Sequence, residues 1–100
     1  MIVISGTIEF DAANTDAMIA ATDELVAATT QEAGCVSYGF WFHPGQPGVA
    51  RVIEEWADDD ALNAHMGADH MMAFLGAAGG FGISSTSINR YDVSAVTKFM

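Results

Sequence analysis

The sequence predicts an α+β fold in which one antiparallel sheet carries helices on a single face. Residues 1–10 alternate between apolar and polar side chains, as a half-buried strand does. Two later strand-like segments flank a connection rich in Pro and Gly, and segments with helical periodicity precede and follow this pair. The resulting order is strand, helix, strand, strand, helix, strand. It predicts a ferredoxin-like split βαβ-βαβ sheet with helices on one face.

The first elements are a strand and a helix. Met1–Phe10 is the strand, because its isoleucines share one side and its polar residues share the other. Asn14 or Thr15 can cap a helix that we expect to end at Gly34. One stripe of that helix is apolar or threonine: Met18, Ile19, Thr22, Leu25, Val26 and Thr29.

Cys35–Phe42 and Val49–Trp56 are predicted to be adjacent antiparallel strands. Paired Pro-Gly steps in residues 43–48 predict the hairpin between them. The first strand is rich in aromatic and β-branched residues, and residues 40–42 are consecutive aromatics without alternation. Such a run favours burial of both faces at that end of the strand.

A broken helix and a final strand complete the fold. Three aspartates at 58–60 provide a cap and negative charge for a helix that runs to Met66. Gly67 interrupts it, and a second helix is expected from Asp69 to Gly76. The last strand is predicted from about Ser84 to Lys98.

Residues 1–100 are expected to form a single domain that self-associates. A chain of this length has room for one modest core. Yet 51% of the residues are hydrophobic before glycine is counted, above the roughly 45–50% of ordinary domains with glycine included. A sheet with helices on one face leaves the other bare, here with residues such as Cys35 and Trp41. We therefore expect a homodimer in which two sheets pack face to face.

The charge of the chain excludes two classes of partner. The formal net charge is −10, which repels nucleic-acid phosphates and anionic lipid headgroups over a Debye length of about 8 Å. The start of the sequence lacks the basic segment of a signal peptide, and no apolar run is long enough to span a membrane. A cytoplasmic protein is expected, with no nucleic-acid or membrane partner. Cys35 is the only cysteine, so no internal disulfide can form.

An ordered set of motifs covers nearly the whole chain: Glu32-Ala33-Gly34-Cys35-Val36-Ser37-Tyr38, Glu54-Glu55-Trp56, Ala61-Leu62, His65-Met66, His70-Met71 and Phe74. In these motifs the sequence resembles the antibiotic biosynthesis monooxygenase domain, and within it the small quinol monooxygenases. The resemblance implies a dimeric α/β barrel. It also implies the oxidation of phenols, hydroquinones or polycyclic aromatics by dioxygen, with no metal, flavin or haem cofactor. In such chemistry the substrate anion reduces dioxygen, and a peroxide then collapses to a quinone.

The catalytic candidates are His65, Trp56 and Glu54. His65 is the preferred base, because imidazole exchanges protons near neutral pH. Trp56 Nε1 and the Tyr38 hydroxyl can donate to a developing oxyanion, and Glu54 can orient His65 or raise its basicity. The candidate substrate-binding residues are Tyr38, Phe40, Met66, His70 and Phe74.

These candidates also have structural interpretations. Glu54 can be a partly buried carboxylate paired across the sheet, Trp56 a core side chain, and His65 a ring that binds a neighbouring carbonyl. We expect no metal site, because a spacing of five places His65 and His70 about 140° apart on a continuous helix. The break at Gly67 weakens that objection but supplies no third ligand.

Two other functions remain open. An isomerase of a small phosphorylated or polyhydroxylated compound is one, although the scarcity of Arg and Lys argues against a phosphorylated ligand. A non-catalytic dimer that binds hydrophobic molecules is the other. The volume of the pocket bears on this choice, since binding cavities usually reach about 300 Å³ or more.

Overall fold

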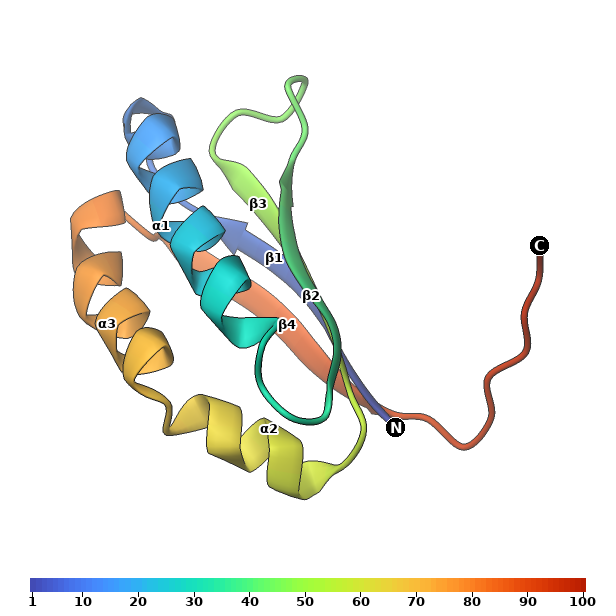
Figure 1. The fold of residues 1–100 in the computed structure, drawn as a ribbon. Helices are drawn as coiled ribbons and strands as arrows, with labels where there is room; N and C mark the ends of the chain where they lie inside the picture. Colours follow the sequence, from blue (N-terminus) through green and yellow to red (C-terminus); the bar gives the residue numbers. More distant parts are fainter.

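The protein folds into one antiparallel sheet of four strands with its helices on one face (Figure 1). The computed structural model describes all residues from 1 to 100. Its elements are β1 (Ile2–Glu9), η1 (Ala12–Asn14), α1 (Thr15–Thr29), β2 (Cys35–Phe42), β3 (Val49–Trp56), α2 (Asp59–Met66), α3 (Asp69–Ala78), η2 (Gly79–Phe81) and β4 (Ser85–Asp92). The strand order β2-β3-β1-β4 confirms the predicted ferredoxin-like α+β class. No helix combines the length and the hydropathy that crossing a membrane requires.

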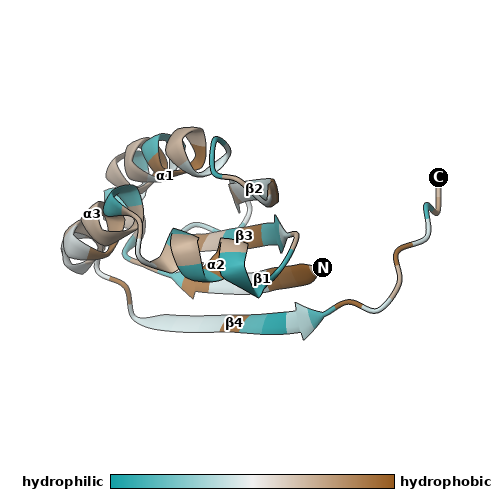
Figure 2. Ribbon diagram, turned by 60° about the horizontal axis from the view of Figure 1, so that its bottom comes forward, coloured by the Kyte–Doolittle hydropathy of each residue, from teal (hydrophilic) through white to brown (hydrophobic).

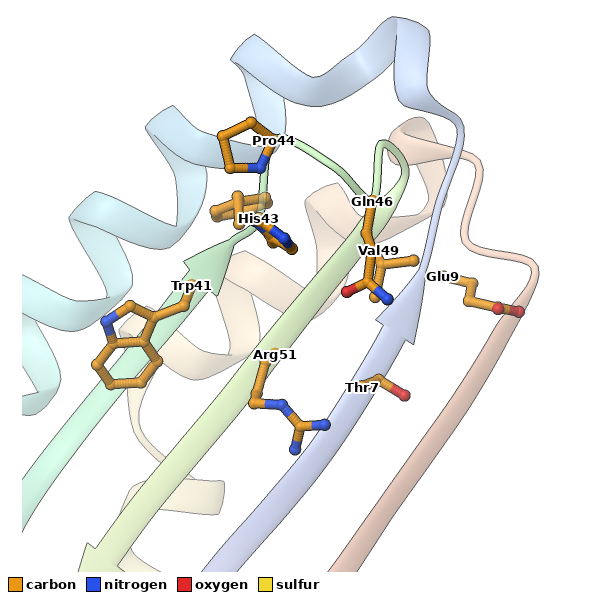
Figure 3. A pocket seen from close by; sticks show the side chains of 9 residues that line it. Thr7, Glu9, Trp41, His43, Pro44, Gln46, Val49 and Arg51 are labelled. Atoms are coloured by element: carbon orange, nitrogen blue, oxygen red, sulfur yellow. The ribbon is translucent and has the colours of Figure 1, made fainter.

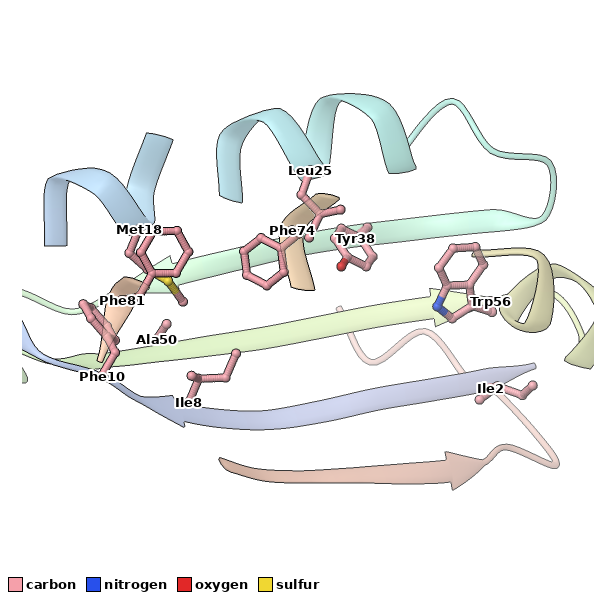
Figure 4. Close-up of a cluster of buried hydrophobic side chains, with 10 residues drawn as sticks. All are labelled: Ile2, Ile8, Phe10, Met18, Leu25, Tyr38, Ala50, Trp56, Phe74 and Phe81. Carbon is pink, nitrogen blue, oxygen red and sulfur yellow. The ribbon is translucent and has the colours of Figure 1, made fainter. Parts of the chain in front are cut away.

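The hydrophobic core lies between the sheet and the helices (Figure 4). Ile2 and Ile8 of β1 are buried on the helix side, and the residues between them alternate in direction. In β3, Ala50, Val52 and Trp56 are buried on the same side. The alternation seen in the sequence therefore sets which face of the sheet meets the helices.

Helix α1 ends earlier than the sequence suggested. Its last residue is Thr29 rather than Gly34, and residues 30–34 form a turn held by backbone hydrogen bonds to the end of the helix. Gly34 closes this turn with φ +80°, a conformation that glycine adopts without strain. The prediction of the end was wrong because glycine closes the turn after the helix rather than the helix itself. The early end places Glu32 on the turn, in front of α2 and α3.

Helices α2 and α3 follow the predicted break at Gly67. The Asp58 carboxylate accepts a hydrogen bond from the N–H of Ala61 at 2.9 Å and so caps α2. No side chain caps the start of α3. Helix α3 continues through Gly76 and ends at Ala78, so the predicted end at Gly76 was two residues too early. Its axis lies beside α1 above the sheet (Figure 1).

Strand β4 is shorter than the expected segment from Ser84 to Lys98. It ends at Asp92, which pairs with Ile2 at the start of β1, so the residues that follow have no strand beside them. Figure 2 shows β4 along the edge of the sheet, mostly hydrophilic or neutral, and a C-terminal tail that runs away from the body.

The face of the sheet that points away from the helices is bare in the single chain. Trp41 lies on it and is 56% exposed, so only one face of the aromatic run in β2 is covered. Cys35 does not share this face, and that prediction was wrong. A β-bulge between Cys35 and Ser37 changes the alternation, and Cys35 packs on the core side opposite Trp56.

Candidate active site

A cavity of about 180 Å³ lies between the sheet and α3. Most of its lining is apolar and comes from all four strands and from α3. Among the predicted substrate-binding residues, Tyr38, Phe40 and Phe74 line it. Glu54 also lines it, and Glu54 is the cavity's one side chain that can be charged at neutral pH. The cavity is therefore a small apolar space next to a carboxyl group.

Glu54 lies on β3, directly across from Tyr38 on β2. The Nε1–H of Trp56 donates a hydrogen bond of 2.9 Å to Glu54 Oε1, and Oε2 has no partner within the chain. Burial raises the pKa of Glu54, and neither the Trp56 hydrogen bond nor the nearby His65 compensates for it. A carboxylate with a raised pKa and one free oxygen is equipped to accept a proton.

Tyr38 is a hydrogen-bond donor rather than an acid in this site. Burial, and then the charge of Glu54, raise the pKa of its phenol well above the ordinary value. Its hydroxyl makes no hydrogen bond within the chain. The neutral O–H is thus free to donate to an oxygen atom of a bound molecule.

Trp56 is fully buried at one end of the core (Figure 4). We expected its N–H to donate to a substrate oxyanion, but in the structure this N–H donates to Glu54. Its indole also packs against His65, with ring centroids 4.8 Å apart. Trp56 therefore fixes the direction of the Glu54 carboxylate.

His65 is buried on α2 and does not line the cavity. Its Nδ1 lies 2.7 Å from Glu32 Oε2, so the carboxylate that orients it is Glu32 instead of the predicted Glu54. Its Nε2 is buried without a partner. His65 does not line the cavity whereas Glu54 does, so Glu54 is the better placed candidate base.

Glu32 joins His65 to His70. His70 Nε2 lies 3.0 Å from the same oxygen, Glu32 Oε2. Burial favours a higher pKa for Glu32, but the hydrogen bonds from His70 and His65 outweigh it and lower the pKa. Sequence reasoning assigned no role to Glu32, because its partners lie 33 and 38 residues further along the chain.

Two of the predicted substrate-binding residues do not line the cavity. Met66 ends α2 and is 49% exposed, because it lies about 100° around the helix from His65, the residue that α2 buries. His70 points toward α1 and borders a separate hollow between α1 and α3. The prediction missed Met71, Leu75 and Ala78, which line the cavity together with Phe74. Their spacing of three and four residues along α3 is the signal that could have identified them.

The bare face holds a larger hollow of about 550 Å³ (Figure 3). Trp41, Arg51, Thr7 and Glu9 lie across it on three neighbouring strands, and His43 and Pro44 border it at the hairpin. This hollow is wide and partly polar, and its lining contains no buried acid or base. We therefore place the candidate active site in the smaller cavity.

Comparison with solved structures shows the fold to be widespread. A Deinococcus radiodurans protein whose description names an antibiotic biosynthesis monooxygenase superposes on this chain with a TM-score of 0.90 at 22% identity. The alignment covers 100% of this chain and 99% of that one. A Caulobacter crescentus CB15 protein with the same description superposes with a TM-score of 0.85 at 26% identity, over 94% of this chain and 90% of that one. A conserved protein of Methanosarcina mazei Go1 superposes with a TM-score of 0.82 at 23% identity, over 90% of this chain and 89% of that one.

Sequence comparison gives the family. No curated protein matches the sequence. The sequence model described as "Antibiotic biosynthesis monooxygenase" matches residues 1–77, which include both histidines of the Glu32 cluster and the Glu54–Trp56 pair. Since this match extends over more than half of the chain and agrees with the fold, the chain belongs to the antibiotic biosynthesis monooxygenase family.

Proposed function

We propose that the protein is a cofactor-independent monooxygenase that oxidises a single-ring phenol or hydroquinone with dioxygen. Family membership supports monooxygenase-type chemistry in general. The observation that supports this reaction is the Glu54 carboxylate, with its raised pKa, beside the free hydroxyl of Tyr38 in an apolar cavity. These groups meet the two polar needs of phenol oxidation, a proton acceptor and a donor to the phenolate oxygen.

The volume of the cavity selects the size of the substrate. At about 180 Å³ it is smaller than a typical drug-sized pocket of roughly 300 Å³ or more. An engineered protein cavity of about 150 Å³ is known to hold benzene. One substituted ring therefore fits without rearrangement, whereas a polycyclic aromatic requires α3 or β4 to move. This supports single-ring substrates over the polycyclic ones.

The reaction begins with proton transfer to Glu54. The phenol O–H gives its proton to the free Oε2, and the Tyr38 hydroxyl donates to the phenolate oxygen that forms. The electron-rich ring then passes one electron to dioxygen, and the two radicals combine at a ring carbon. Protonated Glu54 returns its proton to the new peroxide, which becomes a hydroperoxide.

The second half of the reaction releases water. Glu54 removes the hydrogen from the ring carbon that carries the hydroperoxide, and the O–O bond breaks. The departing hydroxide takes this proton to form water, and the ring becomes a quinone. One atom of dioxygen enters the product, the other enters water, and all electrons come from the substrate. The apolar lining excludes bulk water from the intermediates.

The decisive experiment is isotope labelling of the product. Purified protein is incubated with ¹⁸O₂ and a panel of phenols and hydroquinones with one or two rings, and oxygen uptake is followed. We expect turnover of single-ring phenols and one ¹⁸O atom in each quinone. Absence of oxygen uptake across the panel would refute the monooxygenase and leave the hydrophobic-ligand-binding dimer. The isomerase has no observation in its favour, because the cavity lining contains no Arg or Lys for a phosphate and is too apolar to bind a polyhydroxylated compound.

We also propose that two copies pair through the bare face of the sheet. Support comes from Trp41, a large aromatic side chain left 56% exposed on that face. Light scattering coupled to size exclusion measures the mass directly, and we expect twice the 10.5 kDa of one chain. Substituting Trp41→Ser is expected to shift the mass toward a single chain. A monomeric wild-type protein would exclude the pairing.

A further inference from the structure

We propose that Glu32, His65 and His70 form a binding site for one divalent transition-metal cation, preferably Zn²⁺. This site lies outside the cavity, because none of the three residues lines it, and it goes beyond the proposed oxidation. The three side chains come from the turn after α1, from α2 and from α3. A bound cation would therefore tie together three elements that are distant in the sequence.

The donor atoms are already gathered. His65 Nδ1 and His70 Nε2 lie 2.7 and 3.0 Å from Glu32 Oε2, and all the donor atoms of the cluster lie within 4.8 Å of one another. In a tetrahedral zinc site with bonds of about 2.0–2.1 Å, neighbouring donor atoms are about 3.3 Å apart. The carboxylate oxygen thus has to move away from each ring nitrogen by less than about 1 Å to admit the ion. The two ring nitrogens, which are up to 4.8 Å apart, also have to approach each other by up to about 1.5 Å, and the partly exposed His70 side chain has room to make that movement.

The chemistry of the donors suits zinc. Two imidazoles and one carboxylate are the set found in several zinc sites that keep a fourth position for water. Hard cations such as Mg²⁺ and Ca²⁺ prefer oxygen-only surroundings, so the two ring nitrogens select a transition metal. The net charge of −10 on the chain also favours approach of a cation.

The histidine tautomer needed for binding is accessible. Glu32 is the only hydrogen-bond partner of His65, at Nδ1, and Nε2 has none. The one acceptor that favours the proton on Nδ1 is Glu32, which itself becomes a ligand of the cation, so the proton can shift to Nε2 when the cation takes the Nδ1 lone pair. The rings of Tyr38 and Trp56 pack against His65 and keep its orientation fixed.

The cluster can be reached from solvent without unfolding. The His70 side chain is 28% exposed and the Glu32 side chain 16%, while His65 forms the buried floor. His70 and Glu24 border a hollow of about 250 Å³ between α1 and α3. An ion entering from this hollow meets His70 first, and the exposed side leaves space for a water ligand.

The test is direct metal binding by the full chain. Metal-free protein is titrated with Zn²⁺ by calorimetry and with Co²⁺ by visible absorption, which reports the coordination geometry. We expect one tight site per chain and a rise in melting temperature with saturating Zn²⁺. His70→Ala and Glu32→Gln are expected to weaken binding by about 100-fold or more, because even the outer partners of metal ligands affect affinity about 10- to 100-fold.

The third histidine of the chain supplies the matched control. His43 lies in the exposed hairpin away from the cluster, so His43→Ala is expected to bind Zn²⁺ like the wild type. Circular dichroism of each metal-free variant verifies that it is folded; His65→Ala is avoided because this ring is buried. Absence of saturable binding by the wild type would overturn the proposal. So would full affinity in the variant that combines His70→Ala with Glu32→Gln, since that binding would belong to surface carboxylates.

Discussion

Glu54 and Glu32 are two carboxylates in neighbouring parts of the molecule with opposite properties. Burial raises the pKa of Glu54, whose one hydrogen-bond donor is the neutral indole of Trp56. Burial also acts on Glu32, but hydrogen bonds from His70 and His65 outweigh it and lower the pKa. The partners of a carboxylate therefore decide whether it exchanges protons or persists as an anion, and burial alone does not.

Removal of the Glu54 carboxylate tests its role as the base, and we expect the largest effect of all the variants, a loss of oxidation rate. Glu54→Gln keeps the shape and the Trp56 hydrogen bond but cannot accept a proton. We expect the oxidation rate to fall by about 100- to 10,000-fold, the usual contribution of a general base. Oxygen uptake with the best single-ring phenol measures it.

The neighbouring residue provides the control for this variant. Glu55 lies next to Glu54 on β3 but faces the other side of the sheet, where it accepts a hydrogen bond from Ser37. Glu55→Gln is expected to retain the wild-type rate. Comparable losses in the two variants would mean that the assignment of the base is wrong.

Replacement of the indole changes the partner of Glu54. Trp56→Phe removes the N–H that holds Oε1, so the pKa of Glu54 should rise further and the acid limb of the pH–rate profile should move to higher pH. The lost hydrogen bond and the smaller ring should destabilise the fold by about 2–4 kcal/mol. Urea unfolding gives the stability. An unchanged pH profile in Trp56→Phe would count against its positioning role.

The two carboxylates should also differ in stability. Glu32→Gln loses charge-assisted hydrogen bonds to two rings, and we expect a cost of about 1–3 kcal/mol in the free energy of unfolding. Glu54→Gln should cost less or be stabilising, because it removes a buried charge that has a single donor. Both are measured in a metal chelator, so that the hydrogen bonds alone are compared. A larger loss of unfolding free energy in Glu54→Gln than in Glu32→Gln would contradict this account of the two carboxylates.

The pH dependence of stability gives the smallest and most specific effect. Because the pKa of Glu54 is raised in the folded state, the folded protein holds this proton more tightly than the unfolded chain. Its contribution to stability is therefore full below the ordinary pKa of glutamate and is lost as pH rises through the raised value. We expect the unfolding free energy of the wild type, relative to Glu54→Gln, to decrease from acidic to neutral pH. A difference that stays constant or increases would show that the folded-state pKa is not raised.

Much of the fold follows from local patterns. The bounds of β2 and β3 agree with the prediction, because turn residues and aromatic or β-branched runs delimit both. The errors occur where another part of the chain decides the outcome. The end of α1 depends on the turn that Gly34 closes, and the end of β4 depends on where β1 begins opposite Asp92.

The site was predictable in its composition but not in its contacts. Glu54, Trp56 and Tyr38 were predicted as candidates, and the structure brings them together, since all three lie on adjacent strands whose facing is set by alternation. Their roles changed because the hydrogen bond between Trp56 and Glu54 depends on side-chain conformation. Glu32 was missed because its contacts with the histidines exist only after three elements have packed together. No periodicity in the sequence indicates such a contact.

The bulge in β2 makes Val36 an extra residue of the strand. Cys35 pairs with Trp56 and Ser37 with Glu55, so Val36 has no partner of its own on β3, and its side chain is exposed. Deletion of this one residue should restore regular alternation from Tyr38, with Ser37 outward and Cys35 still on the core side. In evolution this position should therefore accept substitutions and gaps alike.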